Sequence, residues 1–63
     1  MCLSKAFIQK NGERELLLEE VSSVKAQDGK ILLTTLFGEQ KEVRAGIKEI
    51  DFMTHNLVLA ETA

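Results

Sequence analysis

Cys2 is the residue whose type and position most clearly offer chemistry. It is the only cysteine among 63 residues, and it stands beside the start of the sequence. There a thiolate can be joined in one plane by the terminal amine and a deprotonated backbone amide nitrogen. With Met1 retained, the donors would be the Met1 amine and the Cys2 amide nitrogen and sulfur; with Met1 removed, they would be the Cys2 amine and sulfur and the Leu3 amide nitrogen. Such tetragonal nitrogen and sulfur donation suits Ni(II) or Cu(II) better than zinc, which prefers a tetrahedron.

Metal binding of this kind would depend on pH and could involve a second chain. Each donor must lose a proton, and the ordinary pKa values are about 8 for an α-amine and about 8.5 for a thiol, so affinity should fall below neutral pH. A thiolate from a second molecule would fill the remaining position in the plane and couple metal binding to homodimer formation. Position alone, however, favours Cys2 as an ordinary small apolar residue at the start of a strand, and chelation chemistry does not decide between the two interpretations.

The other polar residues give weaker signals. His55 is a second candidate ligand, but it lies in a predicted turn at residues 54–56, where histidine tolerates positive φ, so we leave it out of the metal site. The sequence has no glycine-rich phosphate loop and no paired-cysteine zinc spacing. The carboxylates are scattered and are predicted to be surface charges: Glu19, Glu20, Glu39, Glu42, Glu49 and Asp51. We therefore predict that the chain is not an enzyme.

The composition is that of a compact domain near the lower size limit for folding. The chain is 44% hydrophobic and 29% charged, without proline, tryptophan or tyrosine, and residues 1–63 are predicted to form a single domain. A core this small rarely supplies more than about 3–5 kcal/mol, so self-association or a bound metal would be a reasonable supplement. A lone cysteine cannot form an internal disulfide, which agrees with a reducing compartment.

Charge and hydropathy argue against two classes of partner. The formal net charge is −2, and acidic and basic residues alternate without a basic stripe, so nucleic acid is an unfavoured partner. Phe7, Phe37 and Phe52 are predicted to lie in the core, not on a base-stacking platform. The longest apolar runs, residues 16–18 and 31–33, fall far short of the roughly 20 residues needed to cross a bilayer, and no signal-peptide pattern follows Met1. We expect no membrane partner and a cytoplasmic location.

The elements that would position these residues are predicted to be strands. Asn11-Gly12 and Asp28-Gly29 are strong signals for tight hairpin turns. Short segments rich in apolar and branched residues surround them, at residues 3–9, 13–18, 21–26, 30–37, 42–52 and 57–60. Residues 13–27 can also be drawn as a helix, although Val21-Ser22-Ser23-Val24 has weak helix propensity and we favour strands.

Alternation along the predicted strands indicates how they would fold together. Leu32, Thr34 and Leu36 would share one side of their strand, opposite Ile31, Leu33 and Thr35. Further turns are expected at residues 38–40 and 54–56. The sequence therefore predicts an all-β fold, a small SH3-like or similar barrel of about five to six short antiparallel strands, because closure hides the sheet edges.

Nearly the whole chain resembles the CooT family of small proteins associated with carbon monoxide dehydrogenase maturation. The resemblance depends most on Met1-Cys2 opening into a strand and on the block at residues 34–39, Thr-Thr-Leu-Phe-Gly-Glu. It implies a small β-barrel that binds Ni(II) through Cys2, with backbone nitrogens of Met1 and Leu3 as further donors. It also implies a nickel chaperone or accessory role toward a client nickel enzyme or other nickel-insertion factors, with dimers linked to the site.

Two other functions stay open at this stage. Members of the same group have been described as RNA-binding proteins, so a small RNA-binding β-barrel is the alternative function. A third hypothesis is an interaction module in which Cys2 forms an intermolecular disulfide.

Overall fold

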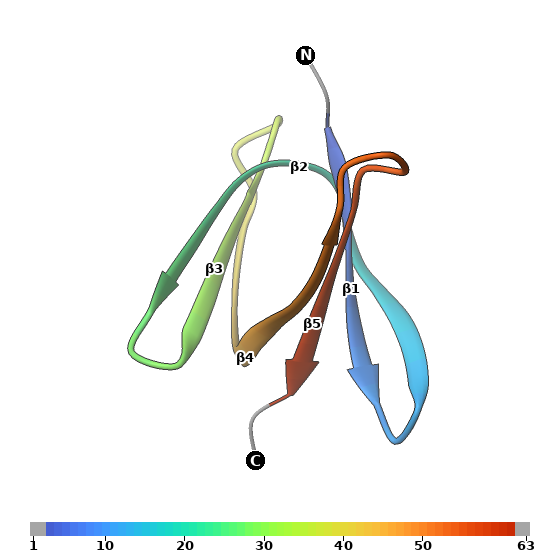
Figure 1. Ribbon diagram of the computed structural model, residues 1–63. Helices are drawn as coiled ribbons and strands as arrows, with labels where there is room; N and C mark the ends of the chain where they lie inside the picture. The colour runs from blue at the N-terminus through green and yellow to red at the C-terminus, as the bar shows by residue number, and fades with distance from the viewer. Residues whose placement is uncertain (1–2, 62–63) are drawn as a thin grey trace.

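The computed structural model describes residues 3–61. Within this range the chain forms five strands and no helix, so the predicted all-β fold is confirmed and the helical alternative for residues 13–27 is wrong (Figure 1). The strands are β1 (Ser4–Lys10), β2 (Glu13–Gln27), β3 (Lys30–Thr35), β4 (Gln40–Asp51) and β5 (Asn56–Glu61).

Two tight turns were predicted correctly from their residue types. Asn11-Gly12 joins β1 to β2, and Asp28-Gly29 joins β2 to β3. All four residues have positive φ, between 50° and 80°. Asparagine, aspartate and glycine tolerate this region best, which is why these pairs of residues specify the reversals.

The strands β2 and β4 are long because each takes part in two halves of the barrel. The first part of β2 pairs with β1 and the second part with β3, while β4 pairs first with β3 and then with β5. Residues 13–18 and 21–26, predicted as separate strands, are therefore one bent strand. The bend lies at Glu20, whose φ is 56°, with register shifts on either side. Bulges of this kind sharpen strand twist and let one strand turn a barrel corner.

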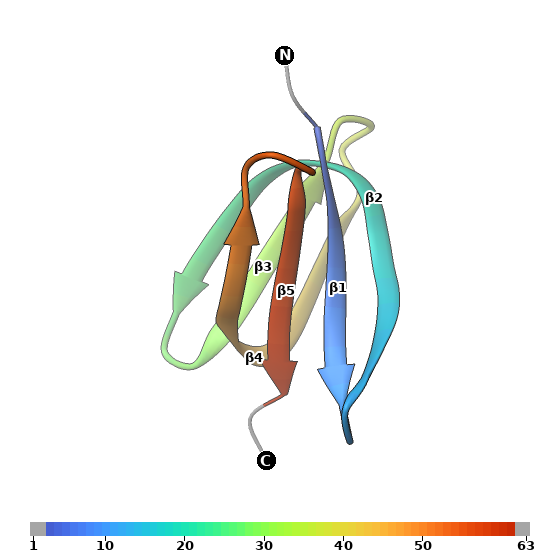
Figure 2. The same cartoon turned by 45° about the vertical axis from the view of Figure 1, so that its right-hand side comes forward.

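A pairing between the first and last strands closes the barrel. The order is β1-β2-β3-β4-β5, and β5 pairs with β1 in parallel (Figure 2). The predicted antiparallel arrangement holds for the other four pairs. The closing pair differs because four successive reversals of direction leave β1 and β5 pointing the same way, as parallel pairing requires.

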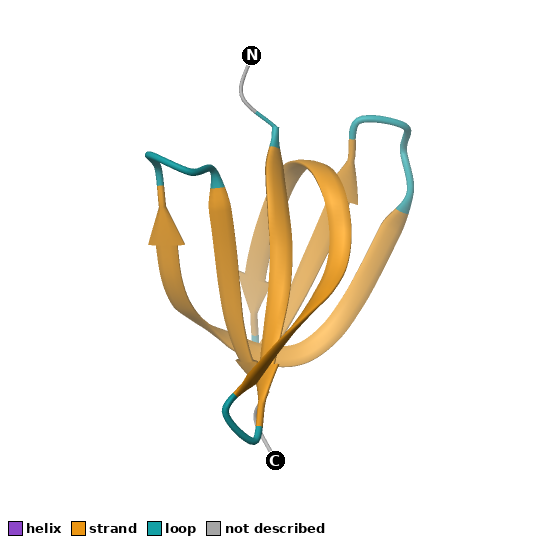
Figure 3. Ribbon diagram, turned by 90° about the vertical axis from the view of Figure 1, so that its right-hand side faces the viewer, coloured by secondary structure: helices purple, strands orange, loops and turns teal. Residues whose placement is uncertain are grey.

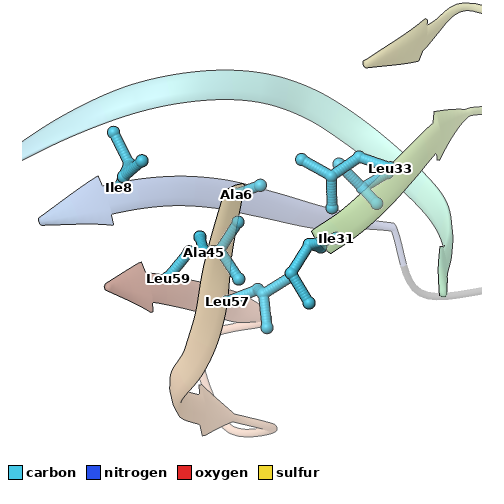
Figure 4. Packing of buried hydrophobic residues seen from close by; sticks show 8 residues of the cluster. Ala6, Ile8, Ile31, Leu33, Ala45, Leu57 and Leu59 are labelled. Carbon is cyan, nitrogen blue, oxygen red and sulfur yellow. The ribbon is translucent and has the colours of Figure 1, made fainter. Parts of the chain in front are cut away.

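Alternate residues of the strands point inward and form one core. On β3, Ile31, Leu33 and Thr35 share one side, as their alternation predicted, and the structure shows that this side is buried. The buried cluster draws on every strand and consists of Ala6, Ile8, Val21, Ile31, Leu33, Ala45, Leu57 and Leu59 (Figure 4). Leu17, Leu18 and Val43 pack against it from less buried positions.

The prediction that the phenylalanines lie in the core is wrong. Phe37 and Phe52 are largely exposed, and Phe7 is half-buried. The physical reason is that β3 ends at Thr35 and β4 at Asp51, so Phe37 and Phe52 fall in the turns that follow. Phe7 lies between the inward residues Ala6 and Ile8 and so faces the outside of β1.

Candidate functional site

The predicted metal site begins outside the described part of the chain. Met1 and Cys2 lie outside the described residues, and Leu3, half-buried, is the first residue that the structure places. β1 starts directly afterwards at Ser4, which pairs with Val21 of β2. The position of Ser4 therefore fixes where the segment carrying Cys2 meets the barrel.

Two turns lie at the same end of the barrel as the start of β1. Figure 3 shows the beginning of β1 between the β3–β4 and β4–β5 loops. The backbone N–H of Lys5 donates to the carbonyl of His55 at 3.0 Å, which joins β1 to the turn at residues 52–55. The N–H of Leu36 donates to the carbonyl of Glu20 at 2.9 Å, which joins the bend of β2 to the turn at residues 36–39. We call this end, made of residues 3–5, 19–21, 36–39 and 51–55, the N-terminal face.

His55 lies in a turn, as predicted, and its φ is 57°. Turn geometry thus accounts for a histidine at this position. The structure adds that His55 lies beside the start of β1, where its carbonyl accepts a hydrogen bond from Lys5. Lys5 follows Cys2 by three residues in the sequence. The sequence carries no signal for this proximity, because residues 5 and 55 meet only when β5 closes the barrel.

Asp51 organises the β4–β5 turn. Its Oδ1 accepts hydrogen bonds from the backbone N–H of Met53 at 2.9 Å and of Thr54 at 3.2 Å. Hydrogen bonds from Thr54 and then Met53 lower the pKa of this carboxyl below its ordinary value, and nearby His55 lowers it further. The carboxylate is ionised at neutral pH and holds residues 52–55 in place.

Thr35 plays the corresponding part in the β3–β4 turn. This buried residue accepts hydrogen bonds at Oγ1 from the N–H groups of Phe37 at 3.3 Å and Glu39 at 3.1 Å. Its own N–H donates to the carbonyl of Glu39 at 2.9 Å. The block at residues 34–39, singled out in the sequence, is thus a structural unit that shapes one side of the N-terminal face.

The remaining carboxylates are surface charges, as predicted. Three ion pairs join half-exposed side chains: Arg14 to Glu49 at 3.2 Å, Lys10 to Glu61 at 3.4 Å and Lys5 to Glu19 at 4.0 Å. Within residues 3–61, no group of three or more His, Cys, Asp or Glu side chains could hold a metal. No helix in that range is long and apolar enough to span a membrane.

A hollow of about 330 Å³ lies next to the start of β1. It runs between the second half of β2 and the second half of β4, and Ser4 and Asn56 line it together with aliphatic residues such as Val24, Ile47 and Ile50. None of its lining residues titrates near neutral pH. The hollow is an apolar groove without the acid or base that hydrolytic or proton-transfer chemistry needs.

Comparison with known proteins assigns the chain to a family. The family model described as CO dehydrogenase accessory protein CooT matches residues 1–60. This chain belongs to the CooT family. A crystal structure described as CooT from Carboxydothermus hydrogenoformans is similar to the chain with a TM-score of 0.90 and 31% sequence identity, covering 98% of this chain and 100% of that one. No curated protein matched.

The CooT match confirms the family resemblance drawn from the sequence. It includes Met1-Cys2 as well as the residues of the N-terminal face, because it begins at residue 1. The close structural similarity extends over the whole barrel, so the turns at residues 36–39 and 52–55 belong to the shared fold.

Proposed function

We propose that this CooT protein is a cytoplasmic nickel-binding accessory protein that assists the maturation of a nickel enzyme such as CO dehydrogenase. The observation that carries the proposal is the match to the family model of the CO dehydrogenase accessory protein CooT. The match begins at residue 1 and therefore includes Met1-Cys2 as well as the barrel. The chain is a binding protein in this proposal, not an enzyme, and nickel is its cargo.

Cys2 supplies the thiolate, and neighbouring nitrogens supply the rest of a planar donor set. These nitrogens are the Met1 amine and Cys2 amide, or the Cys2 amine and Leu3 amide after removal of Met1. The position of β1 supports this use of the segment: the strand begins at Ser4, so the described sheet pairing starts after Leu3. Nitrogen and sulfur donors in one plane favour Ni(II) over zinc.

A second chain would complete the metal plane with its own Cys2 thiolate and give a nickel-linked homodimer. The proposed donors precede Ser4, where β1 begins, so they lie outside the described sheet pairing. The client enzyme, or another nickel-insertion factor, could then take the metal by exchanging ligands one at a time.

The test is a Ni(II) titration of protein with an unextended native amino terminus, beside Cys2→Ala. We expect saturable binding with thiolate-to-nickel absorption, lost in Cys2→Ala although the variant keeps its circular dichroism spectrum. His55→Ala is the matched control and should bind as the parent does. Stoichiometric binding that persists in Cys2→Ala would contradict the proposal.

A further inference from the structure

The barrel has an open corner between the first half of β2 and the first half of β4. A hollow of about 420 Å³ lies there, lined by residues of β1, β2, β4 and β5. Within the described chain, residues 13–18 pair only with β1 and residues 40–44 only with β3. Each half-strand at this corner therefore has one edge that no described strand covers, and an uncovered edge can pair with another chain.

The floor of this hollow is apolar. Ile8 is buried and belongs to the core cluster, and Leu17 and Val43 pack against that cluster from half-buried positions. The hollow thus reaches the outer layer of the core. An apolar side chain placed here would be removed from water together with the remaining exposed parts of Leu17 and Val43, which is favourable.

Charged residues stand at inward positions beside the floor. Directly opposite residues of an antiparallel pair share one face of the sheet. Glu15 of β2 lies opposite Ile8, and Lys41 of β4 lies opposite the buried Leu33 of β3, so both take inward positions. Apolar residues are the rule at such positions. Packing of the barrel therefore does not explain these two charges.

The charge that remains in the hollow is positive. Lys10 and Glu61 also line it and neutralise each other as an ion pair at 3.4 Å. The other charges on its walls are Lys41 and Arg44 on β4 and Glu15 on β2. Among residues 3–61, none of these three side chains forms an ion pair. Two cations thus stand against one carboxylate.

Lys30 increases the positive charge around Arg44. The two residues lie directly opposite each other on β3 and β4, and like charges so placed repel each other. Glu42 precedes Arg44 by two residues on β4, but in the described part of the chain it pairs with neither cation. A carboxylate from another chain, bound at Arg44, would relieve this repulsion.

We propose that this hollow is a docking site for an extended segment of a partner protein in which carboxylates flank an apolar side chain. The apolar side chain would cover Leu17 and Val43, and the carboxylates would pair with Lys41 and Arg44, which stand on either side of Val43 along β4. The main chain of the segment would pair with the uncovered edge of residues 40–44, as in other cases of strand addition. Charged residues at such an edge discourage pairing with unmatched chains, so charge selects the partner.

This site is independent of the proposed metal site, because none of its residues belongs to the N-terminal face. A nucleic acid fits the hollow less well than an acidic segment. Its phosphates would approach Glu15, and it would leave the apolar floor at Leu17 uncovered.

The test measures fluorescence anisotropy of a labelled synthetic peptide, in which leucines alternate with glutamates, at low ionic strength without metal. We expect saturable binding to the parent. Lys41→Glu/Arg44→Glu should weaken it at least about tenfold, because both ion pairs are replaced by repulsion. Lys25→Glu/Lys48→Glu is the matched control, since it makes the same change of net charge at exposed positions outside the hollow. The control should bind as the parent does, and circular dichroism should show that all variants are folded.

A second pair of measurements tests the apolar floor and the unpaired edge. Val43→Thr, which keeps the side-chain shape, should weaken binding several-fold, and a peptide with lysines in place of the glutamates should not bind. Equal binding of the parent and Lys41→Glu/Arg44→Glu, or no binding of the acidic peptide to the parent, would overturn the proposal. So would a single-stranded oligonucleotide that binds more tightly than the peptide and depends on the same two cations.

A chain shortened to end at Glu61 tests whether the protein fills the hollow with its own residues. It should bind the acidic peptide as the parent does. Markedly tighter binding by the shortened chain would mean that residues 62–63 compete for the hollow, and this would overturn the docking of a partner. None of these outcomes depends on nickel binding, so the proposed function stands or falls separately.

Discussion

At the scale of single residues, two small polar side chains shape the N-terminal face. Thr35 and Asp51 each accept two backbone hydrogen bonds in the turn that follows their strand. Alternation in the sequence put Thr35 on the same side of its strand as Ile31 and Leu33, and the structure shows that this side is the buried one, whereas Asp51 was grouped with the scattered carboxylates. Recognising a turn-forming aspartate requires knowing where the strand ends, and the predicted strand ran one residue too far, to Phe52.

The stability contributed by Asp51 should depend on pH. Its pKa is lowered from 3.8 in the folded chain by the hydrogen bonds from Thr54 and Met53. The contribution is therefore present above pH 3.8 and is lost as the pH falls through the lower pKa of the folded state. We expect Asp51→Ala to unfold at a lower urea concentration at pH 7, with the difference from the parent shrinking below pH 3.8. Asp51→Asn, which keeps the acceptor oxygen, is the control and should lie between the two at pH 7.

Replacing Thr35 should destabilise the turn at residues 36–39. Thr35→Val keeps the shape of a buried side chain but removes the acceptor for the N–H groups of Phe37 and Glu39. Unsatisfied buried groups cost about 1–3 kcal/mol each, and part of that cost is recovered here if water reaches the turn. We expect a loss of about 1–2 kcal/mol in urea unfolding, with faster amide exchange at Phe37 and Glu39. Thr34→Val is the control, since its side chain points outward; an equal loss there would contradict the role of Thr35 Oγ1.

At the scale of elements, residue types predicted the turns and most of the strands. Asn11-Gly12 and Asp28-Gly29 allowed the hairpins to be placed from the sequence, because few residues accept positive φ. The bend at Glu20 was missed, because glutamate at positive φ carries no residue-type signal, and the gap before Val21 was taken as a break between strands. Strand ends are also hard to place from the sequence. The predicted strands ran to Phe37 and Phe52, whereas β3 ends at Thr35 and β4 at Asp51, and both phenylalanines were therefore wrongly predicted to lie in the core.

Glycine should be required in the turn before β3 and dispensable within β4. Gly29 has a φ of 76°, whereas Gly46 is within β4 outside the left-handed region, and an added Cβ meets nothing within 4 Å at either position. The two substitutions therefore differ in backbone strain alone. Gly29→Ala should lower the free energy of unfolding by about 1–2 kcal/mol. Gly46→Ala should leave it unchanged or raise it by up to about 1 kcal/mol. Equal urea midpoints for the two variants would contradict this account.

At the scale of the whole molecule, closure of the barrel assembles the N-terminal face. Lys5 meets His55, and Glu20 meets Leu36, only because β5 pairs with β1 and β2 bends over to β3. The sequence alone, through Met1-Cys2 and residues 34–39, indicated the family, which the CooT match confirms, and predicted a metal ligand at Cys2. It could not indicate which loops lie beside the start of β1, because those contacts join distant segments of the chain.

The place of the proposed donors in the sequence leads to a prediction about stability. All donors of the proposed site belong to residues 1–3, so an unfolded chain retains them. A ligand stabilises the native state only if it binds that state more tightly than the unfolded state. When it binds the native state alone, the gain is about 2.7 kcal/mol at a ligand concentration of roughly one hundred times the dissociation constant. Saturating Ni(II) should therefore leave the urea midpoint of dilute protein unchanged. Stabilisation should appear only as the protein concentration rises and nickel links two folded chains.

Urea titrations with and without Ni(II), at protein concentrations spanning about two decades, would measure this dependence. Cys2→Ala is the control and should show no effect of nickel at any concentration. A large nickel-induced rise in the midpoint that does not change with protein concentration would mean that the folded barrel itself supplies a donor. His55, held beside Lys5 at the start of β1, would then be the side chain to substitute, and loss of the rise in His55→Ala would place it in the metal site.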